Sequence, residues 1–409
     1  MDVLGVGRWL DERAEAVAGF YRPSLMVEIW VTLLFYGGGW LEDLELLRAR
    51  GIRRLFGWAR VPDPTTLGRW LRRAGKRLLP VLEELTRHLV RQRWAEVGVP
   101  GAVTLVLDST VVVRYGKKQA GAEVGYNPKK PGRPSHHPLL AVVAETGDLL
   151  GIRWRGGSAH TAAGAQAWIE ELVGWLRAAG VEEITVRLDK GFYAQAMVKT
   201  LEALEVFYVL KIPNQGFVRD ALGTWRLSVR GHGIFPRAET VYSAAGRLWG
   251  ARLLSLQGRR PLAQTEGTFA LDTHEVTDTA HVLTNIEGIH AITAWRLYNA
   301  GAVVEQRIEE LGQLSLGKTA IDDRAGNALL WALGGLAYQL FHTLRHALYG
   351  HWRRAQPKRL RAWLFRTPGR FTTSGRQSTL EIPTGDFEHG LLPVALAVLG
   401  RLRAPPLPA

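Results

Sequence analysis

The sequence predicts a mixed α/β fold in which a sheet covered by helices is interrupted by an all-β segment and flanked by helical N- and C-terminal segments. Three observations predict it. Periodic apolar positions mark helices over residues 1–100. From residue 101, apolar runs typical of strands alternate with helical patterns, which is the order of helices packed on a sheet. Over residues 214–288 the helical period disappears, and short apolar runs are separated by glycine-rich or polar turns.

Charge is the strongest signal in the composition. The 409 residues include 52 Lys and Arg against 38 Asp and Glu, a net charge of +14. Such a surplus indicates a polyanionic partner. We favour nucleic acid over a membrane, because no distinctive amphipathic basic helix is present. A basic fold without a nucleic-acid role stays open as the alternative.

Several classes of site and location are excluded or disfavoured. There is no cysteine, so disulfides, thiolate nucleophiles and zinc–cysteine sites are excluded. The longest apolar run, 328–344, contains Gln339 and His342 and is predicted to be a buried helix rather than a membrane span. The first residues lack the pattern of a secretion signal, so we expect a cytoplasmic protein.

The N-terminal region, residues 1–100, is predicted to be a helical domain for DNA binding or dimerisation. Helical patterns cover residues 23–38, 63–79 and 78–94, and Pro64 with the two threonines after it opens the second of these. Five cations follow on one broad side of that helix, and they form either a DNA-contacting face or a solvated one: Arg69, Arg72, Arg73, Lys76 and Arg77.

The next region, residues 101–213, is predicted to alternate strands and helices. Two apolar runs joined through Thr146–Gly147–Asp148 indicate a hairpin, and Gly180 ends an amphipathic helix. The expected order is a strand over 104–116, the hairpin over 136–157, a helix over 161–180, a strand over 183–193, a helix over 194–206 and a strand over 207–214.

The C-terminal half begins with the all-β segment 214–288. Strands are expected around 224–231, 251–258 and 280–288. Helices resume over 290–314 and 328–349, within the segment 289–350, and the segment 351–409 begins with a basic stretch.

Two of the predicted strands carry an aspartate among hydrophobic neighbours, Asp108 in LVLDST and Asp189 in VRLDKGF. A buried carboxylate is costly unless cations or donors compensate it, and a divalent metal is the strongest compensation. Mg²⁺ takes carboxylate oxygens and completes its shell with water and phosphates. The alternative is structural, with Asp108 capping its strand or pairing with Arg187.

A third carboxylate cannot be chosen from spacing. The helix over 301–314 offers Glu305, Glu309 and Glu310 beside an apolar stripe. Glu305 and Glu309 share one side of the helix at the i, i+4 spacing, so periodicity does not separate them.

Three blocks of the sequence resemble the signature blocks of DDE transposases from bacterial insertion sequences. They are DSTVVVRYGKKQAGAEVGYNPKKPGRPSHHPLLA (108–141), RLDKGFY (187–193) and YNAGAVVEQRIEELG (298–312). The first block is similar specifically to the thirteen-eighty group, related to the insertion-sequence-four type. The resemblance runs from roughly residue 25 to residue 350.

The resemblance implies a ribonuclease H-like catalytic domain, split into 101–213 and 289–350 by the insertion 214–288. It implies Asp108, Asp189 and Glu305 as the catalytic residues and ligands of two Mg²⁺ ions, with Mn²⁺ substituting. The implied activity is cleavage at transposon ends and strand transfer into target DNA. The implied partners are double-stranded DNA, as terminal inverted repeats and target, and a second copy of the chain, with no membrane.

The sequence departs from the family pattern near the last acid and after the second. Gly301 and Gly312 stand where an arginine and a lysine are usual, and Lys190 stands where a serine is usual. Arg296, Arg307 or Lys190 are candidates to supply the missing phosphate contacts. The departures leave open a domesticated DNA-binding protein without catalysis, and a nuclease without strand transfer is a further alternative.

Further DNA contacts are expected around the predicted catalytic site. The loop KKPGRPSHH is rich in Pro and Gly and carries cations suited to backbone contact. The histidine pair within it is a weak candidate for metal binding, because adjacent strand residues point opposite ways. The candidates are Lys117, Lys118, Lys129, Lys130, Arg133, His136, His137, Lys190, Tyr298 and Arg307.

Overall fold

The N-terminal region is helical in the computed structural model of the chain. The structure describes residues 4–115, 119–125, 130–230, 240–261, 275–300, 302–314, 319–348, 350–362, 369–374 and 377–381, with single residues around them. The first elements are α1 (Val6–Arg13), η2 (Glu15–Val17), α2 (Pro23–Tyr36), η3 (Leu41–Arg48), α3 (Arg50–Leu55) and α4 (Pro64–Val97).

Helix α4 joins two helical patterns of the sequence into one helix of 34 residues that runs through Pro80. Its start follows from local chemistry, because the Asp63 side chain accepts a hydrogen bond from the backbone N–H of Thr66 at 2.8 Å. Pro64 occupies the first turn, where no backbone donor is needed. The helix therefore begins where the sequence predicts.

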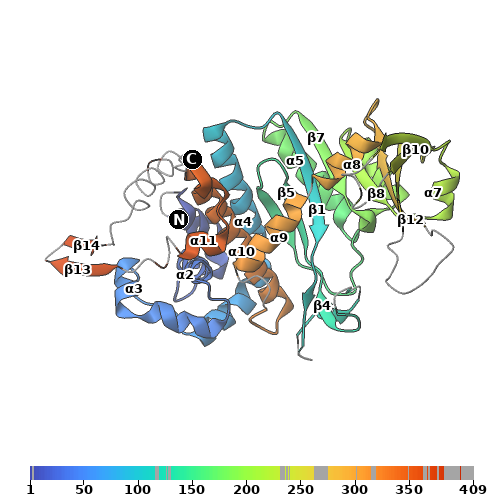
Figure 1. The fold of residues 1–409 in the computed structure, drawn as a ribbon. Helices are drawn as coiled ribbons and strands as arrows, with labels where there is room; N and C mark the ends of the chain where they lie inside the picture. The colour runs from blue at the N-terminus through green and yellow to red at the C-terminus, as the bar shows by residue number, and fades with distance from the viewer. Residues whose placement is uncertain are drawn as a thin grey trace, which may run out of the picture.

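A nine-stranded mixed sheet forms the centre of the molecule, in the order β6-β5-β1-β7-β8-β12-β11-β10-β9 (Figure 1). Its first five strands are β1 (Ala102–Ser109), β5 (Leu139–Val143), β6 (Leu149–Arg153), β7 (Glu183–Leu188) and β8 (Phe207–Ile212). β5 and β6 form the predicted hairpin beside β1, and β1, β7 and β8 are parallel. These orders and directions are those of a ribonuclease H-like sheet, so the predicted fold class is confirmed.

The all-β segment extends this same sheet. Its strands are β9 (Arg226–Arg230), β10 (Thr240–Leu248), β11 (Ala251–Pro261) and β12 (Glu275–Thr284). β12 pairs antiparallel with β8, which joins the segment to the central strands. The sequence did not predict β10, whose Ala, Ser and Gly residues lack a strong apolar alternation.

Helices cover both faces of the sheet. α5 (Ala165–Ala178) and α6 (Gln195–Ala203) pack on the face that carries Leu105 of β1. On the opposite face, α9 (Ala302–Gln313) packs through Val304 against Val106 of β1, and α8 (Ala291–Asn299) packs beside β8 and β12. Figure 1 shows α9 lying over the region of β1 and β5, with α10 (Arg324–Ala347) beside it.

Smaller elements complete the described chain. The strand predicted over 104–116 is divided into β1 and β2 (Val112–Val113), and β2 joins β3 (Glu123–Val124) and β4 (Pro134–His136) in a three-stranded sheet. The remaining elements are η4 (Lys190–Phe192), α7 (Gly216–Asp220), η5 (Gly350–Arg354), α11 (Pro357–Leu360) and the hairpin of β13 (Arg370–Ser374) and β14 (Gln377–Glu381).

Helix α10 contains the longest apolar run and packs against α2 and α4 in the N-terminal core, as a buried helix. No single helix among the described residues has the length and apolar character of a membrane span, although α2 and η3 together pass that test as a pair bent by 93°.

Candidate active site

Two neighbouring parallel strands bring Asp108 and Asp189 to the same edge of the sheet. Leu107 of β1 pairs with Leu188 of β7, so the two aspartates occupy adjacent positions on strands that lie about 4.8 Å apart. Side chains alternate between faces along a strand. Because Val106 faces α9, Asp108 faces it as well, and Arg187 and Asp189 follow the same alternation on β7.

Asp108 lies in an environment that opposes its negative charge. Burial, together with the charges of Asp189 and Glu305, raises the pKa of its carboxyl to about 6, against the opposing effect of Arg187. A backbone N–H, that of Ser109, donates to the carboxylate at 2.7 Å. Asp189 and Glu305 therefore both lie within electrostatic reach of Asp108.

Asp189 is held by a tyrosine from α8. The Tyr298 hydroxyl donates to Asp189 Oδ1 at 2.9 Å. Burial raises the pKa of Tyr298, and the neighbouring Asp189 charge adds to the effect, so the phenol remains a proton donor at neutral pH.

Two cations flank the ring of Tyr298. The Arg187 guanidinium lies 5.3 Å from the ring centroid, and the Lys211 ammonium lies 5.2 Å from it. Arg187 is buried, and burial lowers its pKa while the acids around it act in the opposite direction. The two aspartates thus sit beside a tyrosine and two positive charges.

The structure separates the three glutamates that spacing could not. Glu305 is exposed and acts on the charge of Asp108. Glu309 accepts from Gln313 at 3.4 Å on the outside of α9. Glu310 is buried and pairs with Arg345 at 2.8 Å. Among the three, only Glu305 contributes to the surroundings of Asp108.

A cleft of about 700 Å³ opens beside the two aspartates. Lys190 and Gly191 form one wall, and His137 and the loop 158–161 form another. Arg155 fixes this loop, because its guanidinium donates to the carbonyl of His137 at 3.0 Å and to that of Thr161 at 2.7 Å. The cleft thus combines two acids, two histidines and an exposed lysine.

The donor set fits a hard divalent cation. Carboxylate oxygens are the ligands that Mg²⁺ prefers, and a cation would offset the burial and the like charges that raise the pKa of Asp108. Across the described residues, no three His, Asp or Glu side chains are gathered closely enough to hold an ion as they stand. Glu305 is the exposed member of the three acids.

The predicted DNA contacts fall into distinct environments. All five cations of α4 are exposed. Of these, Arg72 pairs with Asp322 at 2.7 Å, and Arg77 donates to the carbonyl of Ala16 at 3.2 Å. Within the described part of the chain, Arg69, Arg73 and Lys76 are therefore the cations of this face without such a partner, and the face stays a predicted DNA contact.

The cation-rich loop lies close to one exposed aromatic ring. The Lys130 ammonium lies 5.8 Å from the ring centroid of Tyr115, and the Arg133 guanidinium lies 5.5 Å from it. All three side chains are exposed, and so is Arg296 on α8. Lys117, Lys118 and Lys129 lie outside the described residues.

Two predicted DNA contacts are wrong. His136 is 0% exposed and packs on Trp154, with ring centroids 4.5 Å apart; burial lowers its pKa to about 4. Its neighbour His137 lines the cleft instead, so the two histidines point opposite ways as strand geometry requires. Arg307 points into the interior, where it pairs with Glu310 at 2.6 Å.

Sequence reasoning missed one contributor to this site. Lys211 lies in the apolar strand β8 beside Tyr298, and a lysine within a buried run was the signal that could have found it. From sequence, Trp249 was a candidate to stack on a DNA base; in the structure Tyr193, beside the η4 turn, stacks on Trp249 with ring centroids 5.1 Å apart and on Phe217 at 6.3 Å. No periodicity links these three segments, so only the fold brings them together.

One family model matches nearly the whole chain. The family described as Transposase DDE domain group 1 matches residues 9–404. A solved structure, the cryo-EM structure of the piggyBac transposase synaptic complex with hairpin DNA, is similar over 99% of this chain and 84% of that one, at 13% identity and a TM-score of 0.43. No curated protein sequence matches the chain.

Proposed function

The chain belongs to the transposase DDE domain group 1 family, and from that premise we propose that it cuts DNA at transposon ends and transfers the freed strands into target DNA. One observation carries the proposal. Asp108 and Asp189 end adjacent parallel strands on the face of the sheet where Glu305 approaches. The insertion-sequence thirteen-eighty group is the proposed subgroup.

The residues of the site have separable roles in this reaction. Asp108, Asp189 and Glu305 would hold two Mg²⁺ ions, for which Mn²⁺ substitutes. When bound, the ions activate water or a 3′-hydroxyl and stabilise the leaving oxygen during in-line displacement at phosphorus. Tyr298 fixes the orientation of Asp189 through its hydroxyl. Lys190, exposed at the cleft, supplies a positive charge for a DNA phosphate.

The order of steps follows from the chemistry of the phosphodiester bond. Attack by water on the bond at the transposon end leaves a free 3′-hydroxyl. That hydroxyl is the nucleophile of the second step, in which it attacks the opposite strand or target DNA and displaces another 3′-oxygen. No protein nucleophile is needed.

The proposed partner is double-stranded DNA, bound by a homodimer that pairs two transposon ends in the cytoplasm at the nucleoid. The net charge of +14 supports the DNA partner. Exposed cations on α4 and at Lys130 and Arg133 would contact phosphates outside the cleft.

The test uses a plasmid that carries the gene with its own flanking DNA, purified protein, and Mg²⁺, Mn²⁺ or EDTA. Asp189→Ala is compared with Asp220→Ala, which removes an exposed carboxylate of α7. The expected result is excision that requires metal, is abolished by Asp189→Ala but not by Asp220→Ala, and yields joined products on sequencing.

Each other outcome has a definite meaning. Binding of the flanks without cleavage by the wild type would favour a domesticated DNA-binding protein, with Gly301 and Gly312 as the first positions to restore. Cleavage without joined products would leave a nuclease of this fold. Loss of DNA binding as large as the loss of cutting in Asp189→Ala would contradict the metal-binding role.

A further inference from the structure

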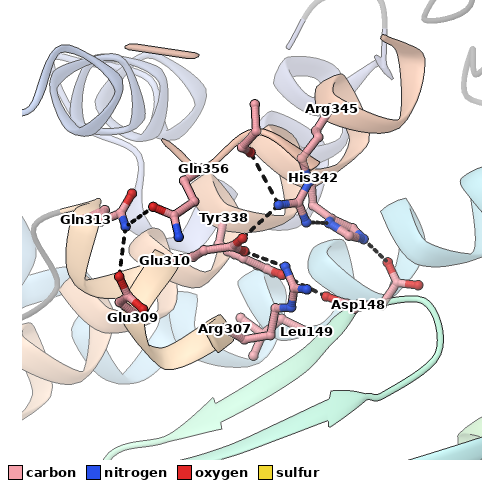
Figure 2. Close-up of polar contacts among 12 residues, drawn as sticks. Asp148, Leu149, Arg307, Glu309, Glu310, Gln313, Tyr338, His342, Arg345 and Gln356 are labelled. Atoms are coloured by element: carbon pink, nitrogen blue, oxygen red, sulfur yellow. Dashed lines mark hydrogen bonds and ion pairs between the residues drawn. The ribbon is translucent and has the colours of Figure 1, made fainter. Parts of the chain in front are cut away.

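A buried charged cluster lies between α9 and α10. Its members are Arg307 and Glu310 of α9 and Arg345 of α10, called here the α9 triad (Figure 2). One oxygen of Glu310 accepts from Arg307 at 2.6 Å and the other accepts from Arg345 at 2.8 Å. Glu310 is 5% exposed and Arg345 is 4% exposed.

The α9 triad is tied into the rest of the fold. Arg345 contacts the His342 ring nitrogen Nδ1 at 2.7 Å, and the other ring nitrogen lies 2.8 Å from the carbonyl of Thr146. Tyr338 donates to the carbonyl of Gly147 at 2.8 Å in the same turn. The triad therefore joins α9 to α10 and to the turn of the β5–β6 hairpin.

The hairpin in turn sets the position of Asp108. β5 pairs directly with β1, with Leu140 opposite Asp108. The hairpin therefore contacts both the α9 triad and β1, and so it fixes the helix that carries Glu305 relative to the strand that carries Asp108. The two acids lie on elements that are remote in sequence, so their relative placement depends on such contacts.

Helix geometry connects the triad with Glu305. Glu310 follows Glu305 by five positions, which corresponds to a rotation of about 140° beyond one full turn and a rise of about 7.5 Å. A small rotation of α9 about its axis would therefore move both side chains together. Pairing Glu310 with Arg345 of α10 therefore fixes the rotation of α9 and with it the direction of Glu305, while the bond from Arg307 within α9 orients the Glu310 carboxylate.

Stability alone is a poor explanation for the α9 triad. Removing charges from water is costly, and replacing a buried ionic cluster by apolar side chains of similar size is often neutral or stabilising. A role in selecting one orientation of α9 accounts both for the energetic cost of burying these charges and for the pairing of each Glu310 oxygen with an arginine.

We propose that the α9 triad is a positioning device that holds Glu305 toward Asp108 and Asp189, and that Glu310 and Arg345 are positioning residues for metal binding. This inference rests on the proposed function, because it assigns the three acids to a metal site. The α9 triad itself touches neither DNA nor the ions.

The experiment measures Mn²⁺ affinity by isothermal titration calorimetry on the full chain, with cleavage of end DNA and thermal unfolding alongside. Glu310→Gln should weaken Mn²⁺ binding on the order of tenfold, the lower end of the range for groups that orient metal ligands. Glu309→Gln is the matched control, since this glutamate lies on the outside of the same helix; it should change the affinity less than twofold.

A second variant keeps the test decisive if Glu310→Gln folds poorly. The triple replacement Arg307→Leu, Glu310→Met and Arg345→Met fills the same space without charge. We expect it to unfold at or above the wild-type temperature and still to bind Mn²⁺ about tenfold more weakly. Wild-type affinity in this folded variant would overturn the inference and leave the proposed function standing. A wild type that neither binds Mn²⁺ nor cuts DNA would overturn both.

Discussion

Asp108→Asn should stabilise the metal-free protein at neutral pH. Burial and the neighbouring acids raise the pKa of Asp108 from 3.8 to about 6, so its ionised form is disfavoured in the folded state. The difference corresponds to about 3 kcal/mol of unfolding free energy once the carboxyl is fully ionised. Asparagine keeps an oxygen to accept the backbone N–H of Ser109 and removes the charge.

The pH dependence has a definite sign. Between pH 4 and 6 the folded state binds the Asp108 proton more tightly than the unfolded state does, so the wild-type unfolding free energy falls as pH rises through this interval. Asp108→Asn lacks this contribution. The advantage of the variant should therefore be absent near pH 4 and complete above about pH 7.

Thermal unfolding in EDTA measures this difference. For 409 residues, an unfolding entropy of roughly 2 cal/mol/K per residue converts about 3 kcal/mol into a midpoint increase of about 4 °C at pH 8. Asp220→Asn, at an exposed position, is the control and should shift the midpoint little. Mg²⁺ should stabilise the wild type and not Asp108→Asn. A variant no more stable than wild type at pH 8 would refute the reasoning.

Two further changes test the surroundings of the site. Tyr298→Phe removes the hydrogen bond to Asp189, so the cleavage rate should fall about 10-fold or more while DNA affinity stays unchanged. Product gels measure the rate and filter binding measures the affinity. An unaltered rate would assign the tyrosine a packing role. Replacing Arg69 and Lys76 by alanine should lower the dependence of log affinity on log salt by about 0.9 for each phosphate that the variant no longer neutralises. Arg72→Ala should change it less, because that guanidinium already pairs with Asp322; equal slopes in all variants would mean that this face of α4 contacts solvent only.

The central strands could be predicted because their sequence signals are local. Apolar runs bounded by turn residues mark β1, β5 and β6, and a carboxylate within such a run, as at Asp108, stands out against its neighbours. The parallel pairing of β1 and β7 follows from the intervening helix α5. Both aspartates were therefore predicted from residues near them in the chain.

The errors arose where distant contacts decide the structure. His136 carries no local mark of burial, and its ring is enclosed because β6 brings Trp154 against it. β10 is a strand because β9 and β11 pair with it on both sides, although its own residues favour a strand only weakly.

The last acid shows what sequence spacing leaves undetermined. Glu305 and Glu309 share one side of α9, yet Glu309 is engaged by Gln313, which also bonds to Gln356 (Figure 2). Glu310 is not a candidate for the third acid, because it is buried and pairs with Arg345 of α10. The contact that excludes Glu310 from the site is also the one that fixes the orientation of α9. In the positioning proposal, Glu310 thus determines where Glu305, the proposed catalytic glutamate, lies.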